Sequence, residues 1–477
     1  MGRQEVAQIQ IQLYYNRSIK WGYDMGLNYM KKLFVIFGLL ITMLASSWAK
    51  PEGDIISVPA NPKAGFEWGY LLYIPRNIDT SKTLPILFTM NDSGSFNSVE
   101  ELEQATRKRF GRGNEDYIAY EVGVPMVLPL INRTKGEVNA HDYNRAVFVL
   151  REGPLKRLDL QVLAMIKDAR KRLKGKEIHT QRKFLVNGFS SAGSFGGKLA
   201  LMHPEEILAV VNGGEPYATL PLESLEGIPL IYPIGVYDFQ EYLGKKFNKK
   251  AWLKIPMLVT NGEDDYNDPL PYSDVYGEED RALTLKIYGE GTVQDRLQRV
   301  GEMITKYAPN IQWHVYPHVD HAPIHEDIIT FLKVHLNGGP LKPIALTDTS
   351  TRPTMLPLHV TKIYWGEEAK SIIPEKGWQY LGTEEINLYV AGTFPFWGWK
   401  THNCRFDVLA DGIIVLENKP CRGMFTIADD AHLVTVPFSN EDMQLLTKNK
   451  ASTYTLRSRF PKVWEVPADL TFTVSPR

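Results

Sequence analysis

Residues 183–197, KFLVNGFSSAGSFGG, place two adjacent serines between a short apolar run and a run of small residues. The apolar part predicts a buried strand, and the small-residue part predicts a helix. At such a junction the Ser190 hydroxyl stands at the carboxyl end of a sheet. The backbone N–H of Ser191 then lies at a helix start, where it can bind an oxyanion. The chemistry that these residues indicate is nucleophilic attack by Ser190 on an acyl carbon.

Acidic and histidine side chains follow two later apolar runs and supply the partners that a serine nucleophile requires. A serine hydroxyl reacts poorly unless a base takes its proton and a third group orients that base. One run leads into NGEDD, which ends in Asp264 and Asp265. Another leads into YPHVDH, which ends in His321 just before a predicted helix over 324–336. An acid and a histidine therefore follow the serine in the chain, both after predicted strands.

Apolar runs of strand length alternate with helical patterns from residue 65 to about residue 336. This alternation is typical of α/β proteins, in which helices cover both faces of a mostly parallel sheet. Apolar side chains at helical spacing over 158–173, followed by Gly175, predict one of these helices. The predicted strands are 69–74, 84–90, 125–130, 184–186, 208–211, 255–260 and 311–315.

A stretch rich in glycine and proline separates this unit from the rest of the chain and predicts a domain boundary. We expect the catalytic domain over 50–338, a linker over 339–357 and a β-rich domain over 358–477. Short β-type runs between turn residues make the last domain all-β, with a sandwich as the expected form. Two domains also fit the length of 477 residues, which exceeds what one hydrophobic core usually serves.

The overall charge is balanced, with 54 Lys and Arg residues against 55 Asp and Glu residues. Nucleic acids and anionic membrane surfaces attract proteins through an excess of positive charge. The composition therefore argues against both as partners, and it favours a small or neutral substrate. The oligomeric state is not encoded in any pattern that we identify.

Residues 30–49, MKKLFVIFGLLITMLASSWA, have the parts of a secretory signal peptide. Two lysines precede an apolar run, and Ser47 and Ala49 occupy the small-residue positions of a cleavage site. The run is short for a membrane span, and an uncleaved membrane anchor is the alternative. We expect a secreted or periplasmic protein with no stable membrane span after cleavage. Since a signal peptide normally opens a chain, residues 1–29 are expected to be a non-native or mis-assigned leader.

The chain has two cysteines, Cys404 and Cys421, both in the predicted β-rich domain. In an oxidising compartment such a pair is expected to form a disulfide that closes a short loop. Two buried, unpaired thiols are the alternative.

Residues from about 65 to 336 resemble the α/β-hydrolase superfamily, and within it the secreted esterases and polyester-depolymerase-like serine hydrolases. The matching segments are GFSSAG, GEDD and VDH, in the order and on the elements that the superfamily uses. The resemblance implies a catalytic triad of Ser190, Asp265 and His321, with Asp264 as the alternative acid. One position departs from the family pentapeptide G-x-S-x-G, because Ala192 takes the place of its last glycine.

The resemblance also implies an oxyanion hole made of two backbone N–H groups. One is that of Ser191, and the other is expected near Ser93, in the segment MNDSG that takes the place of the family's His-Gly segment. An ordinary turn is an equal alternative for this segment. Asp92 is expected to point away from the site, because its charge would oppose an oxyanion.

Glu215, Tyr217 and Tyr237 lie on or near loops at the predicted active edge of the sheet, and they are candidates for the substrate pocket. The alternatives are an ordinary loop carboxylate for Glu215 and core packing for the two tyrosines.

The chain also has four histidines within a short segment, but prolines interrupt any helix that would align them. We therefore expect neither a metal site nor a cofactor.

Together these patterns predict a secreted serine hydrolase that cleaves a small-molecule or polymeric carboxylic ester through an acyl-enzyme intermediate. A serine peptidase with the same triad is the first alternative. The second is a non-catalytic binding protein on a hydrolase fold.

Overall fold

The computed structural model describes residues 52–477 apart from residue 92 and the segments 112–114, 134–137, 353–357, 366–384, 392–403, 429–430, 450, 452, 460–463 and 474–477. The predicted leader and signal peptide, and also Asp92, lie outside the described residues. Within the described part of the chain, no helix is long and apolar enough to cross a membrane.

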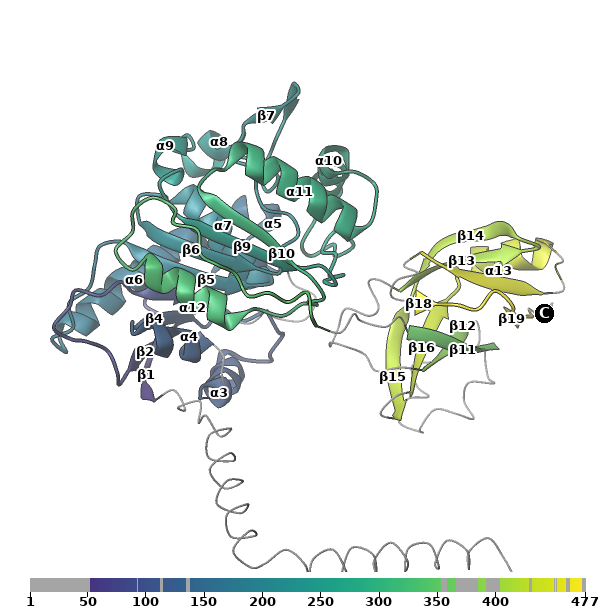
Figure 1. Cartoon of the computed structure of the whole chain (residues 1–477), viewed down its shortest axis with the longest axis horizontal. Helices are drawn as coiled ribbons and strands as arrows, with labels where there is room; N and C mark the ends of the chain where they lie inside the picture. The colour runs from purple at the N-terminus through teal and green to yellow at the C-terminus, as the bar shows by residue number, and fades with distance from the viewer. Residues whose placement is uncertain are drawn as a thin grey trace, which may run out of the picture. The chain divides into compact units, whose positions relative to one another are not determined.

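An eight-stranded sheet forms the centre of the first domain (Figure 1). Its first three strands in spatial order pair antiparallel, and the remaining strands are parallel. The mostly parallel sheet confirms the predicted α/β class. The spatial order is β1 (Gly53–Val58), β2 (Tyr70–Pro75), β4 (Met126–Pro129), β3 (Leu87–Thr89), β5 (Phe184–Phe189), β6 (Ile207–Gly213), β9 (Met257–Gly262) and β10 (Ile311–Tyr316).

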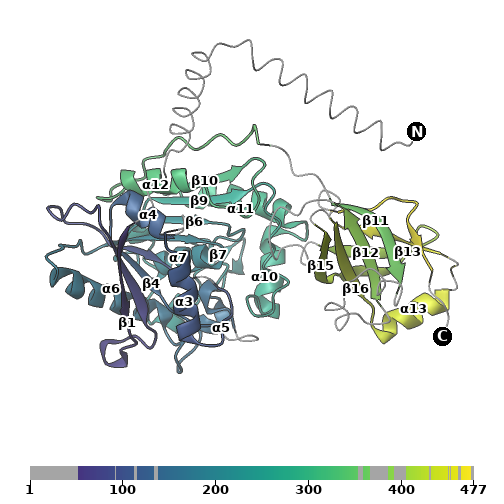
Figure 2. The same ribbon diagram turned by 90° about the horizontal axis from the view of Figure 1, so that it is seen from below.

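Helices cover both faces of this sheet, as the alternation of patterns predicts (Figures 1 and 2). Side chains of β2 alternate between two cores: Tyr70 and Leu72 join one, and Leu71 and Tyr73 join the other. Since successive side chains of a strand point to opposite faces, each core lies on one side of the sheet. The first core includes helices α6 (Leu158–Lys174), α7 (Ser191–Met202) and α11 (Val293–Tyr307), and the second includes α3 (Val99–Arg109), α4 (Glu115–Val122) and α12 (His325–Val334).

Shorter elements occupy the connections between these strands and helices. They are η1 (Pro62–Ala64), η2 (Ala140–Asp142), α5 (Arg145–Phe148), the hairpin of β7 (Ser224–Leu225) and β8 (Ile228–Pro229), α8 (Phe239–Leu243), α9 (Lys249–Trp252) and α10 (Glu278–Tyr288).

Four parallel strands end level with one another, and this alignment determines where the loop side chains meet. Phe189 at the end of β5 pairs with Gly213 of β6, and Gly213 pairs with Thr260 of β9. Gly262 at the end of β9 pairs with Tyr316 of β10. Loops that follow these strands therefore emerge at one edge of the sheet, where ligands of open α/β sheets bind.

The C-terminal part of the chain contains two further sheets and one helix. The five-stranded sheet has the order β15 (Arg422–Ala428), β16 (Ala431–Pro437), β12 (Glu385–Ala391), β11 (Leu358–Trp365) and β18 (Trp464–Glu465). The four-stranded sheet has the order β14 (Ile413–Pro420), β13 (Arg405–Ala410), β17 (Tyr454–Ser458) and β19 (Thr471–Phe472), and α13 (Asn440–Asn449) precedes β17.

The two C-terminal sheets share one hydrophobic core. Val360 and Val434 contribute from the five-stranded sheet, and Phe406 and Leu456 contribute from the four-stranded sheet. This arrangement is the sandwich expected from the sequence, with Leu446 of the added helix α13 in the same core. Cys404 and Cys421 form a disulfide with their Cα atoms 5.3 Å apart.

Candidate active site

Ser190 occupies a sharp turn between β5 and α7. Its backbone has φ 59° and ψ −134°, a conformation that residues other than glycine rarely adopt. The backbone N–H of Ser190 donates to the carbonyl of Gly213 on the neighbouring strand at 2.7 Å, which holds the turn at the sheet edge. Strain at one serine in a strand-to-helix turn is typical of an exposed nucleophile.

Close packing explains why the glycine of the motif stands one position later than in the family pentapeptide. A Cβ atom on Gly188 would lie 2.2 Å from the carbonyl oxygen of Ala192, so no larger residue fits there. A Cβ atom on Gly193 would lie 2.8 Å from the carbonyl oxygen of Gly213 on β6. The close contact between α7 and the sheet is therefore made by Gly193, and Ala192 is left with room for its methyl group.

His321 and Asp265 meet at the carboxyl ends of β9 and β10. Nδ1 of His321 lies 2.8 Å from Oδ2 of Asp265, and both side chains are buried. The loop that carries the acid is fixed by its own backbone, because Asp264 N–H donates to the carbonyl of Val319 at 2.9 Å. The adjacent Asp265 Oδ1 accepts from the N–H of Asn267 at 3.0 Å. Of the two candidate acids, the structure places Asp265 against the histidine.

The imidazole of His321 is held from two further sides. The ring of Phe189, the residue before the nucleophile, lies 4.5 Å from the imidazole centroid. Gly214, which has φ +65°, lies so close that a Cβ atom there would be 2.7 Å from Cε1 of His321. A histidine fixed by a carboxylate, an aromatic ring and a backbone has little freedom to leave the site.

A cavity of about 600 Å³ contains both the serine and the histidine. Such a volume is typical of a pocket for a small organic ligand. The described residues that line it are Thr89, Met90, Asn91, Ser93, Glu115, Ile118, Asn187, Phe189, Ser190, Ser191, Ala192, His321, Ala322, Pro323, His325 and Ile328. Both predicted oxyanion-hole residues, Ser93 and Ser191, therefore line the same cavity as Ser190.

The loop with Ser93 is fixed by the segment that follows β4. Buried Asn91 donates from Nδ2 to the carbonyl of Ile131 at 3.0 Å, and its Oδ1 accepts from the N–H of Ile131 at 3.2 Å. Arg133 donates to the carbonyl of Ser93 at 3.3 Å and forms an ion pair with Asp274. Because the carbonyl of Ser93 is held by a guanidinium, the peptide plane of this loop has a defined orientation.

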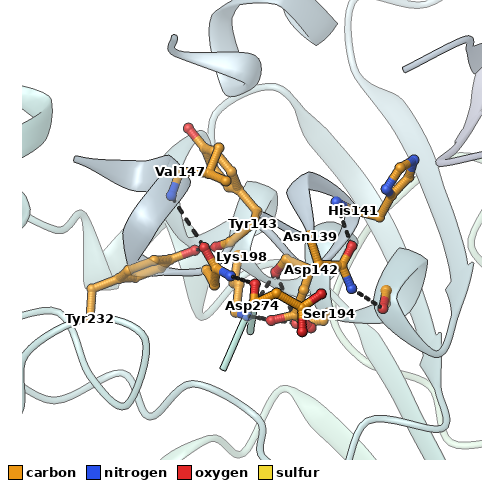
Figure 3. A network of polar contacts seen from close by, with 11 residues as sticks. Asn139, His141, Asp142, Tyr143, Val147, Ser194, Lys198, Tyr232 and Asp274 are labelled. Carbon is orange, nitrogen blue, oxygen red and sulfur yellow. Dashed lines mark hydrogen bonds and ion pairs between the residues drawn. The ribbon is translucent and has the colours of Figure 1, made fainter. Parts of the chain in front are cut away.

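A polar network connects the other side of the oxyanion region to the same Asp274 (Figure 3). Asn139 donates from Nδ2 to Oγ of Ser191 at 3.2 Å, and its backbone N–H donates to the carbonyl of Asp274 at 3.1 Å. Asn144 Nδ2 also donates to that carbonyl at 2.7 Å. Asp274 thus links the loop of Ser93 and the start of α7 through one residue. Sequence patterns gave no indication of Arg133, Asn139 or Asp274, since their partners lie far away in the chain.

A buried lysine belongs to the nucleophile helix α7 itself. Nζ of Lys198 donates to Oγ of Ser194 at 2.6 Å and to the carbonyl of Asp142 at 2.8 Å, and it lies 3.3 Å from the Asp142 carboxylate. Figure 3 shows these three residues converging, with the ring of Tyr232 beside them. Because a buried ammonium needs several partners to offset its lost hydration, this cluster fixes α7 against η2.

Glu215 belongs to this buried cluster. It is one of the predicted pocket residues, yet it is absent from the described residues that line the cavity. Its carboxylate lies beneath α7, where a Cβ atom on Gly197 would be 3.8 Å from Oε2 of Glu215. Burial raises the pKa of Glu215 to about 7, with the charge of Lys198 acting in the opposite direction.

The two tyrosines also lie away from the described cavity lining. Tyr217 is buried and donates to Asp268 at 2.8 Å, while Arg296 donates to the tyrosine hydroxyl oxygen at 2.6 Å. Burial raises the pKa of Tyr217 well above its usual value. Tyr237 is 55% exposed.

Glu115 and His325, which do line the cavity, were not among the residues predicted from the sequence.

No protein-family model matches the chain, and no curated protein matches it in sequence. Solved structures do match part of the chain. A poly(aspartic acid) hydrolase from Sphingomonas sp. KT-1 is 14% identical, with a TM-score of 0.39, over 60% of this chain and 99% of the other. A poly(3-hydroxybutyrate) depolymerase from Bordetella parapertussis is 14% identical, with a TM-score of 0.39, over 59% and 88% of the two chains. A ferulic acid esterase is 12% identical, with a TM-score of 0.36, over 60% and 98%.

The fold follows from the chain's own features: the mostly parallel eight-stranded sheet, the strained serine between β5 and α7, and the acid and histidine on the loops after β9 and β10. The first domain has the α/β-hydrolase fold, and it resembles the serine hydrolases of that superfamily.

Proposed function

We propose that this protein is a serine hydrolase that cleaves a carboxylic ester through an acyl-enzyme intermediate on Ser190. One observation carries the proposal: the strained Ser190 shares a cavity with His321, whose Nδ1 lies 2.8 Å from the buried Asp265 carboxylate. These three residue types in this order are the parts that acyl transfer by serine requires. The cavity supplies space for the reacting ester beside them.

In the proposed reaction Nε2 of His321 takes the proton of the Ser190 hydroxyl while Oγ bonds to the carbonyl carbon. The resulting oxyanion is stabilised by the backbone N–H of Ser191 and by the loop of Ser93. When the tetrahedral intermediate collapses, the alcohol leaves with the proton from His321. Water then attacks the acyl-enzyme with His321 again as base, which releases the acid and restores the serine. Asp265 remains ionised and orients the imidazole throughout.

A fluorophosphonate probe tests the nucleophile directly, because it forms a covalent adduct only with an activated serine. We expect one adduct on Ser190, identified by mass spectrometry, and no adduct in Ser190→Ala. Ser224→Ala, an exposed serine on β7, serves as the matched control and should label as the wild type does. Absence of labelling, or undiminished labelling of Ser190→Ala, would support a non-catalytic binding protein instead.

A second measurement separates an esterase from a peptidase. Short para-nitrophenyl esters and peptide para-nitroanilides report cleavage of the two bond types with related chromophores. We expect turnover of the esters and little or none of the anilides. Faster cleavage of an anilide would make the protein a serine peptidase with the same triad.

We also propose that the protein is exported, on the basis of the signal-peptide pattern at residues 30–49. Expression in a bacterium followed by N-terminal sequencing tests this directly. We expect the periplasmic or secreted protein to begin close to residue 50. Recovery of uncleaved protein from the membrane fraction would favour the anchor.

A further inference from the structure

Helices α4 and α12 each contribute two side chains to the lining of the cavity, one polar and one apolar. Glu115 and Ile118 are three positions apart on α4, and His325 and Ile328 are three positions apart on α12. Residues at this spacing lie on the same side of a helix. The cavity wall formed by α4 and α12 thus combines two apolar side chains with a carboxylate and an imidazole.

Glu115 places a carboxylate in this cavity wall. Its Oε2 atom is buried and, among the described residues, has no hydrogen-bond partner. Glu115 is also the only carboxylate among the described lining residues, and none of them is Lys or Arg. A carboxylate that lines a cavity can accept charge-assisted hydrogen bonds from a cationic group of a ligand.

His325 lies at the first position of α12 and adds a second acceptor to this wall. Burial lowers the pKa of His325, while the charges of Glu326 and Glu115 act to raise it. With its pKa lowered, the imidazole is neutral near pH 7, and one of its nitrogens can accept a hydrogen bond. The ring of Tyr117 lies 6.2 Å away in an edge-on arrangement and packs beside it.

A carboxylate in the cavity also bears on the proposed reaction. Negative charge develops on the substrate oxygen in the transition state, and a like charge in the same low-dielectric cavity would raise the barrier. A cation bound to Glu115 removes that penalty. The arrangement therefore favours substrates that carry their own positive charge.

From these observations we propose that Glu115 and His325 form a subsite that binds an ammonium group on the ester substrate. The inference rests on the proposed esterase function and adds the substrate class, an ester with a protonated amine. Glu115 supplies a charge-assisted hydrogen bond, His325 supplies a second acceptor, and Ile118 and Ile328 contact the methylene chain of the substrate. The amine belongs to either the acyl part or the alcohol part.

Matched pairs of esters test this subsite and show which part carries the amine. The acyl pair is the para-nitrophenyl esters of aminohexanoate and heptanoate, and the alcohol pair is aminohexyl butanoate and heptyl butanoate. We expect the wild type to prefer the amine in one pair by about 10-fold in kcat/KM, as a charge-assisted hydrogen bond provides. In Glu115→Gln the ratio of kcat/KM for the amine ester to kcat/KM for the neutral ester should fall to about 1. Glu115→Asp should retain part of the wild-type ratio.

Glu121→Gln is the matched control, since Glu121 lies on the same helix and pairs with Lys333 at 3.7 Å on the surface. It should keep the wild-type preference. Equal rates for amine and neutral ester in both wild-type pairs would overturn the inference, as would a preference that survives in Glu115→Gln.

Binding to Ser190→Ala separates this inference from the proposed function, because binding needs no turnover. Calorimetric titration with the same pairs should show the amine preference there, and Glu115→Gln in that background should remove it. Failure of every ester to react, with the binding preference intact, would refute the esterase and leave the subsite. Turnover of neutral esters without any amine preference would refute the subsite and leave the esterase.

Discussion

Replacing Glu215 with glutamine removes a titratable carboxyl from the buried cluster around Lys198 with little change in volume. The carboxylate is buried under the nucleophile helix, and burial raises its pKa from 4.5 to about 7. In the unfolded chain the same carboxyl keeps its ordinary pKa of 4.5. The folded state therefore binds the proton more tightly than the unfolded state does.

The sign and the size of the pH effect follow from this difference. A carboxyl with a raised pKa favours folding most when it is protonated, so its contribution falls as the pH rises from about 4.5 to about 7 and is constant above that. The rise from 4.5 to about 7 in Glu215 corresponds to about 3 kcal/mol, at about 1.4 kcal/mol for each pKa unit. About 2 to 3 kcal/mol of this falls between pH 5 and pH 8.

Urea unfolding at pH 5 and pH 8 measures this contribution. We expect the free energy of unfolding of Glu215→Gln, relative to the wild type, to rise by about 2 to 3 kcal/mol from pH 5 to pH 8. Glu152→Gln, an exposed carboxyl, should leave the difference close to zero at both values. An identical pH dependence in Glu215→Gln and the wild type would refute the reasoning. It would mean that Glu215 stays ionised in the fold as a partner of Lys198.

Three other substitutions probe the site and the second domain. Asp265→Asn should lower kcat for ester hydrolysis by about 10³-fold or more, because the imidazole loses its orienting charge; a loss below 10-fold would exclude Asp265 as the orienting acid. Gly214→Ala should lower kcat with little change in KM, since its Cβ atom would lie 2.7 Å from Cε1 of His321 at φ +65°; unchanged steady-state kinetics would contradict the predicted clash. Cys404→Ser should lower the stability of the C-terminal domain by about 3 kcal/mol, measured by calorimetry, because it removes the bridge to Cys421; an unchanged transition would show that the bridge does not stabilise it.

Much of the first domain could be predicted because parallel strands impose a shared edge. Apolar runs identify the strands, and the residues after each run then meet at the carboxyl edge of the sheet. Ser190, Asp265 and His321 are all of this kind, and the register of the strands brings the last two within hydrogen-bond distance. The predicted ends of the strands were less accurate than their positions in the chain. The predicted strand at 84–90 is only Leu87–Thr89 in the structure, since Pro85 has no N–H for the ladder.

Residues that support the site could not be predicted, because their partners are distant in sequence. Asn139 reaches Ser191 across 52 positions, and Arg133 reaches Asp274 across 141 positions. Neither residue belongs to a periodic pattern or a motif. In the structure Asn139 also caps the short helix η2, since its Oδ1 accepts from the N–H of His141 at 3.2 Å. One amide side chain thus has a local role and a distant one, and the fold reveals both.

Glu215 shows why a shared edge does not by itself identify a pocket residue. It follows β6 at the same edge as Ser190, so the edge rule alone places it near the substrate. Gly214 has φ +65°, and the chain therefore turns there through a conformation that other residues rarely adopt. After this turn the Glu215 side chain lies beneath α7, whereas Glu115, from a helix on the other face of the sheet, reaches the cavity. The edge of a parallel sheet determines where loops begin, and the backbone conformation of the first loop residues determines which side chains reach the substrate.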